Sequence, residues 1–246
     1  MIVDQGLAAR IEWAEAEFIT ACVTALGRGG ESTFTEPLAG GMACYAPLDS
    51  PFTKVVGVGF AGLPPAGDLD AVEARYAAHG GSASFEISTL ADPAVFELLT
   101  ERGYRLLGFE DVLICDLGAA AASRPGDIAV EVAGDVELWL SIAVESALTP
   151  DEIGVAQLDQ FSPDVLLSAE RAGLDAGAVP YLARVGGRAA GAGSVHLAGE
   201  FAQLTGAGTL PAFRRRGVQR ELIRRRLHDA ERAGARFQRS GRQHAG

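Results

Sequence analysis

The first half of the chain opens with an amphipathic helical pattern. Apolar residues recur at intervals of three and four from Leu7 to Ala25, and the glycines at 27, 29 and 30 end the run. Strand and helix patterns then alternate up to residue 117. The predicted strands are 32–37, 42–46, 54–60, 82–88, 105–108 and 111–117, and the predicted helices are 68–78 and 94–103. This mixture of strands and helices predicts an α+β fold.

The second half shows a similar alternation. A strand at 128–132 is followed by a helix from Asp135 and a second helix at 165–171. Three consecutive strands follow at 180–185, 189–197 and 201–210, joined by turns suited to hairpins. A long helix with one apolar face then runs to about residue 233. The tail from residue 235 is polar and shows no strand pattern.

A stretch of small residues, Gly118 to Gly126, separates the halves and closes with a Pro-Gly turn signal. The pattern therefore predicts a first domain at 1–118, a linker at 119–126 and a second domain at 127–246.

Composition indicates an ordinary soluble globular protein. Of 246 residues, 48% are hydrophobic and 22% are charged, and there is no run of 18 apolar residues that would cross a membrane. The N-terminus lacks the basic and apolar regions of a secretory signal. The three cysteines lie apart among apolar neighbours, as expected for small buried side chains in a reducing compartment. We therefore expect a cytoplasmic protein, and the spacing of the histidines predicts no metal site.

The charge is unevenly distributed. The net charge is -11, yet the segment from Leu210 to the C-terminus holds eleven arginines against three acidic residues. Such asymmetry can mark a nucleic-acid tail or an anion site. The rest of the chain is strongly acidic and would repel a phosphate backbone, and no aromatic residues alternate with the arginines for base stacking. These features argue against a nucleic-acid partner.

The positive charge is concentrated in one motif, LPAFRRRGVQ, at residues 210–219. A strand that ends in a tight turn and leads into a helix presents backbone N–H groups that favour a phosphate. Gly217 lets a phosphate approach the backbone closely, and arginines in the turn add attraction. The motif therefore predicts a phosphate site.

This motif resembles the [QR]-x-x-G-x-[GA] signature of the GNAT superfamily of N-acetyltransferases, which use acetyl-CoA. Arg214 to Gln219 align with it, and Pro211-Ala212-Phe213 supplies the usual Pro-x-aromatic that precedes it. The resemblance implies that the backbone of Arg216, Gly217, Val218, Gln219 and Arg220 holds the CoA pyrophosphate, with Arg214 and Arg215 in the same motif. It also implies that Thr209 and Leu210 pair with the pantetheine amides, beside strands that splay apart. Gln219 departs from the preferred small residue.

The first half also resembles a GNAT domain, with 54–60 as its fourth strand and 82–88 as its fifth. Its loop AGLPPAG has no basic residue and no RxxGxG. The chain thus resembles tandem proteins of two acyl-CoA N-acyltransferase-like domains, each a mostly antiparallel sheet flanked by helices, in which the N-terminal repeat is degenerate.

By the same resemblance, a fifth strand, a helix and two more strands would follow residue 234, where only twelve residues remain. We therefore expect a second domain that lacks its final strands, which form one wall of the acetyl-CoA cleft and often supply a tyrosine as general acid.

The resemblance implies transfer of an acetyl group to the amine of a small molecule. His196 and Glu200, in the hairpin that leads into the predicted strand 201–210, are candidate general bases, although a polar hairpin tip is the simpler explanation of both. A non-catalytic CoA-binding or regulatory protein is the alternative. The sequence leaves a homodimer open.

Overall fold

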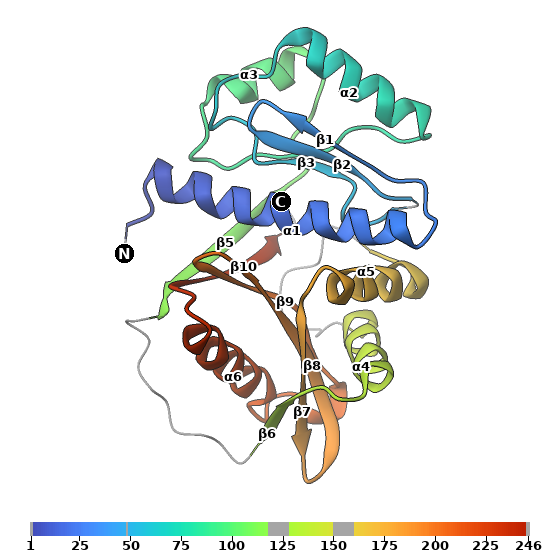
Figure 1. Cartoon of the computed structure of the whole chain (residues 1–246), viewed down its shortest axis with the longest axis vertical. Helices are drawn as coiled ribbons and strands as arrows, with labels where there is room; N and C mark the ends of the chain where they lie inside the picture. The colour runs from blue at the N-terminus through green and yellow to red at the C-terminus, as the bar shows by residue number, and fades with distance from the viewer. Residues whose placement is uncertain (1, 48, 118–127, 150–159, 245–246) are drawn as a thin grey trace. The chain divides into compact units, whose positions relative to one another are not determined.

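The computed structural model describes residues 2–47, 49–117, 128–149 and 160–244. The chain divides into two compact units, Met1–Leu107 and Gly108–Gly246. Each unit contains one sheet covered by helices (Figure 1). The expected α+β class is confirmed.

The first unit has a four-stranded sheet in the order β1-β2-β3-β4. Its strands are β1 (Phe34–Leu38), β2 (Gly41–Tyr45), β3 (Lys54–Val56) and β4 (Phe85–Glu86), and its helices are α1 (Gln5–Arg28), α2 (Ala66–Ala78) and α3 (Ala94–Glu101). The strands pair antiparallel except for β3 and β4, which pair parallel.

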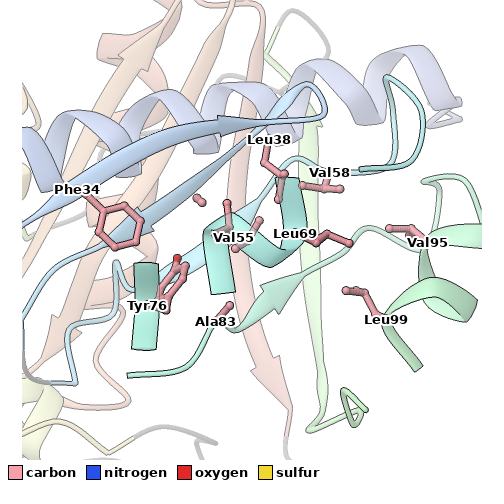
Figure 2. Packing of buried hydrophobic residues seen from close by; sticks show 11 residues of the cluster. Phe34, Leu38, Val55, Val58, Leu69, Tyr76, Ala83, Val95 and Leu99 are labelled. Atoms are coloured by element: carbon pink, nitrogen blue, oxygen red, sulfur yellow. The ribbon is translucent and has the colours of Figure 1, made fainter. Parts of the chain in front are cut away.

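Alternate side chains of this sheet face two separate cores. Val55 packs with residues of α2 and α3, whereas Val56, its neighbour, packs with α1. Figure 2 shows the first of these cores, in which Leu69 and Tyr76 of α2 approach the strands. The helices therefore cover both faces of the sheet.

The second unit has a six-stranded sheet in the order β5-β10-β9-β8-β7-β6. Its strands are β5 (Phe109–Asp116), β6 (Ala129–Val132), β7 (Val179–Val185), β8 (Arg188–Ala198), β9 (Phe201–Thr209) and β10 (Phe237–His244). The helices are α4 (Val136–Leu148), α5 (Pro163–Asp175) and α6 (Val218–Arg232), with a short 3-10 turn, η2 (Pro211–Phe213), before α6. Asp135 and Ser162 cap α4 and α5 through their side-chain oxygens.

Alternation along β7 again separates two faces. Tyr181 and Ala183 pack with residues of α6, whereas Leu182 packs with Trp139 and Leu140 of α4. Figure 1 shows α6 on one side of this sheet and α4 with α5 on the other. The chain passes from β9 through η2 into α6.

Two expectations fail at the edge of this sheet. The tail after residue 235 was expected to form no strand, but β10 pairs parallel with β9 and antiparallel with β5. The segment 105–108, predicted as a strand, forms none, and the strand after it leaves the first unit's sheet. All eight residues of β5 pair with β10. The units therefore divide at Leu107, before the predicted linker, which lies outside the described residues.

Among the described residues, no helix combines the length and apolar character needed to cross a membrane. Cys22 and Cys44 are buried as expected, while Cys115 is partly exposed.

Candidate functional site

The loop between β9 and α6 forms a turn around two left-handed residues. Arg215 has φ 59° and Gly217, the N-cap of α6, has φ 86°. A Cβ atom on Gly217 would meet nothing within 4 Å except the flexible guanidinium of Arg220. The face of Gly217 is therefore open to a ligand.

This turn leaves backbone donors at the start of α6. Glu221 donates its N–H to the carbonyl of Gly217, at 3.1 Å. The preceding amides, those of Val218, Gln219 and Arg220, have no carbonyl four residues back in the helix to accept them. Together with the helix dipole they form a site that favours an anion.

A pocket of about 400 Å³ lies against this helix start. It brings together most of the residues predicted to bind the cofactor, with Leu210 and Arg216 outside its lining. The lining residues are Ser146, Ala207, Gly208, Thr209, Phe213, Arg214, Arg215, Gly217, Val218, Gln219 and Arg220. The end of β9, the arginine loop and α6 thus enclose one space.

The three arginines of the loop have different roles. Arg214 donates from Nε to the carbonyl of Thr209, at 3.2 Å, and from a terminal nitrogen to the carbonyl of Thr149 at the end of α4. Arg216 lies over the ring of Phe213, 5.8 Å from its centroid. Arg215 is exposed at the pocket. Arg214 therefore holds the loop in place, and Arg215 is free to attract an anion.

The strands beside the pocket diverge, as the resemblance implied. Only three positions of β9, Phe201 to Gln203, pair with β10, so the rest of that edge of β9 has no partner strand among the described residues. Leu210 donates its N–H to the carbonyl of Ala190 on β8, at 3.0 Å. Backbone groups alternate in direction along a strand, so those of Thr209 and Ala207 face the open edge.

This assignment changes the expected pantetheine contacts. The N–H of Leu210 is used inside the sheet, and the carbonyl of Thr209 accepts from Arg214, so it is the N–H of Thr209 that lies where an extended chain could pair with it. The hydroxyl oxygen of Thr209 is buried and has no hydrogen-bond partner in the described part of the chain. A buried polar atom without a partner is unfavourable unless a ligand supplies one. Thr209 therefore fits a polar cofactor in this pocket.

A bulge interrupts β9 just before the pocket. Between the pairs Ala192–Gly208 and Ser194–Thr205, β8 contributes one residue and β9 contributes two, Gly206 and Ala207. Gly206 takes a left-handed conformation, φ 49°. Such a bulge bends the strand and directs its backbone groups away from the regular ladder.

A buried arginine supports the bulge from the α6 side. Arg226 donates to the carbonyls of Ser194, at 2.8 Å, and Thr205, at 3.3 Å, which flank the bulge. Burial lowers the pKa of Arg226 to about 10. The guanidinium passes beneath Gly193, where a Cβ atom would lie 3.0 Å from its central carbon. Arg226 thus provides donors for carbonyls next to the irregular segment.

An acidic residue that the sequence did not indicate lies on the other side of the bulge. Glu170 of α5 places its carboxylate against Gly206, and burial raises the pKa of this carboxyl to about 7. In the sequence, Glu170 stands in an amphipathic helix directly before Arg171 and reads as a solvated residue. Only the packing of α5 on β9 reveals its position.

The predicted bases lie elsewhere. His196 pairs with Gln203, and Glu200 occupies the turn between β8 and β9. At about 3.3 Å per residue, they lie roughly 10 and 20 Å along β9 from the bulge. The structure does not bring either residue to the pocket lining. Among the described residues there is also no group of three potential metal ligands.

The residues present fit CoA. Open amides at the start of α6 match a pyrophosphate, and the unpaired edge of β9 matches the pantetheine amides. Within the part of the chain that the structure describes, the hydroxyl of Thr209 lacks a partner that such a ligand could supply. Gln219 is exposed, so its side chain does not close the helix start.

Comparison with known proteins identifies the fold. No protein-family model matches the chain, and no curated protein matches its sequence. The chain is similar to the structure of a GCN5-related N-acetyltransferase from Kribbella flavida, with a TM-score of 0.63 and 18% identity, over 96% of this chain and 85% of that one. It is also similar to a GCN5-related N-acetyltransferase from Sphaerobacter thermophilus, with a TM-score of 0.52 and 16% identity, over 95% and 84% of the two chains. The chain therefore has the GNAT fold.

Proposed function

We propose that this chain is an acetyl-CoA-dependent N-acetyltransferase of the GNAT superfamily that acts on the amine of a small molecule. The observation that carries the proposal is one pocket that joins the open helix start at Gly217 to the unpaired edge of β9. A phosphate site next to an exposed strand edge is the combination that an extended phosphopantetheine chain requires.

Each part of the pocket has a defined task in this reaction. The amides of Val218 to Arg220 bind the pyrophosphate, and Arg215 adds attraction that depends on salt. The edge of β9 at Ala207 and Thr209 orients the pantetheine and offers a backbone N–H to the thioester carbonyl. Acetyl-CoA supplies the activated acetyl group that the amine receives.

The first unit contributes no second CoA site in this proposal. The loop from β3 to α2 has no basic residue, and Pro65 at the N-cap of α2 supplies no side-chain cap. Proline also lacks a backbone N–H that could contribute to an anion site.

Calorimetric titration with acetyl-CoA tests the proposal. Gly217→Glu places a negative side chain on the open face of the helix start, and we expect at least a roughly 100-fold loss of affinity because several charge-assisted bonds are blocked. Gly234→Glu is the matched control, since Gly234 has φ 93° and equally open surroundings but follows the C-terminal end of α6. It introduces the same strain and charge away from the pocket.

The outcomes separate the alternatives. No binding of acetyl-CoA to the wild-type chain at millimolar concentration contradicts the proposal, as does equal affinity of the two glutamate variants. Binding without release of free thiol in the presence of an amine panel favours the second candidate, a non-catalytic CoA-binding or regulatory protein. That candidate draws on the distance of His196 and Glu200 from the bulge.

A further inference from the structure

The carboxylate of Glu170 lies directly on the backbone at the bulge of β9. A Cβ atom placed on Gly206 would be 2.6 and 2.9 Å from the two carboxylate oxygens. Glycine favours this approach, because a side chain at φ 49° would be strained and would have to displace the carboxylate. The strand is thus shaped to admit the carboxylate beside the residues that line the pocket.

This carboxylate has no partner within the described part of the chain. It makes no hydrogen bond or ion pair there, and burial is the one cause of its raised pKa. A buried carboxyl is normally paired, since removing a charge from water is unfavourable. A partly buried carboxyl without a partner, next to a pocket, indicates a functional group.

Three arginines on the elements around Glu170 contact other groups. Strand β9 contains no charged residue. On α5, Arg171 pairs with Glu137 of α4 at 2.8 Å, and on β8, Arg188 lies over the ring of Phe213. On α6, Arg226 reaches the carbonyl of Thr205. Burial alone raises the pKa of Glu170, so Glu145, the other charged group of α4, does not contribute to this shift. An acceptor that carries a positive charge would complete this environment.

We propose that Glu170 is the general base of this chain and that its acceptor is an aliphatic amine, which arrives as an ammonium ion. The proposal rests on the proposed function. The general base then lies on α5, whereas the sequence predicted it in the β8–β9 hairpin. The acceptor is defined by its positive charge.

The step balances in atoms and charge. The ionised carboxylate of Glu170 binds the ammonium group and accepts one of its protons, which leaves a neutral amine. The amine forms the new N–C bond while the thioester C–S bond breaks, and the second proton that nitrogen loses neutralises the departing thiolate. Glu170 then releases its proton to solvent. The products are an N-acetyl amide and a free thiol.

The first experiment measures the protonation of Glu170 without turnover. In the full chain with ¹³C-labelled glutamate and bound CoA, we expect one carboxyl resonance that titrates near pH 7 and is missing in Glu170→Gln. Addition of n-butylamine should move this titration to lower pH, because an ammonium ion stabilises the ionised form. The absence of such a resonance, or no change with butylamine, would overturn the proposal.

The second experiment measures the reaction. With butylamine, kcat/KM of the wild type should rise with pH through about 7, and Glu170→Gln should lower kcat by about 100-fold or more and remove this dependence. With aniline, which is already neutral at pH 7, the same variant should lose much less. Asp175→Asn, an exposed acid on the same helix, is the matched control and should retain the wild-type rate.

Failure of this inference is distinguishable from failure of the proposed function. Normal acetyl-CoA binding with an equal rate of butylamine acetylation in Glu170→Gln and the wild type contradicts only the role of Glu170. A wild-type chain that binds no acetyl-CoA contradicts the proposed function, and the titration of Glu170 in the unliganded chain still tests its ionisation.

Discussion

Three adjacent arginines that are identical in the sequence differ in the structure. Arg214 is bound to carbonyls at the ends of β9 and α4, Arg216 lies over Phe213, and Arg215 remains exposed. The positive φ of Arg215 turns the chain between the other two. The charge of the motif therefore serves both to fix the loop and to attract an anion, through different residues.

Replacing Arg214 and Arg215 in separate variants should distinguish the residue that fixes the loop from the residue that attracts an anion. We expect Arg214→Leu to lower the free energy of unfolding by about 1–3 kcal/mol, because it leaves the carbonyls of Thr209 and Thr149 without a donor. Arg215→Leu should change stability by less than about 0.5 kcal/mol, since it is a surface substitution. Denaturant unfolding of both variants measures this difference.

Affinity for acetyl-CoA should show the complementary pattern. The loss in Arg215→Leu should be several-fold at low salt and should largely disappear at high salt, because the interaction of an exposed charge is screened. The loss in Arg214→Leu should persist at high salt. Equal salt dependence in the two variants would contradict the division of roles.

The sequence indicates the proposed phosphate site but not the proposed base, for a physical reason. The site at Gly217 is built from backbone groups of consecutive residues, so its chemistry is visible in a short motif. The environment of Glu170 depends instead on Gly206, 36 residues later, and on the packing of two elements. No pattern in the sequence around Glu170 predicts that its carboxyl group is buried.

At the scale of elements, periodicity predicted most of the second unit. Strands β7, β8 and β9 and helix α6 lie within two residues of their predicted bounds, because each has a clear apolar face. Strand β10 was missed because its sequence, FQRSGRQH, lacks that pattern. Its backbone is paired by β9 and β5, and Gln238 and Arg239 are buried although they are polar.

Proline substitutions in β5 test its pairing with β10. Leu117 donates its N–H to the carbonyl of Arg236, so by alternation the N–H of Leu113 also faces β10, whereas that of Val112 faces the free edge. Leu113→Pro should therefore be less stable than Val112→Pro by about 1–3 kcal/mol. Thermal unfolding of the two variants provides the comparison, and equal stability would argue that β5 is not held by β10.

At the scale of the whole molecule, β5 decides where the chain divides. The small-residue segment 118–126 has the composition of a linker, but β5 precedes it and belongs to the sheet of the second unit. In that sheet β5 pairs with β10, the strand formed by the tail. The sequence predicted that the final strands of the second domain would be absent at this edge. A strand that precedes the predicted linker therefore occupies part of that edge.

Two fragments distinguish these boundaries. We expect fragment 108–246, which retains β5, to unfold cooperatively and to bind acetyl-CoA. Fragment 127–246 should bind far more weakly and tend to aggregate, because it exposes the edge of β10. Light scattering and calorimetric titration measure both properties.

The two fragments differ in length as well as in the presence of β5. Adding a peptide of residues 105–117 to fragment 127–246 tests whether β5 itself accounts for the difference. Such a peptide can add as a strand to the open edge of β10, and we expect it to restore part of the binding and to reduce aggregation. A peptide with Leu113→Pro should restore less.

If fragment 127–246 alone binds acetyl-CoA as tightly as fragment 108–246, then β5 is dispensable for the pocket. If only the full chain binds, the first unit is required, and the boundary at Leu107 does not separate an independent binding unit.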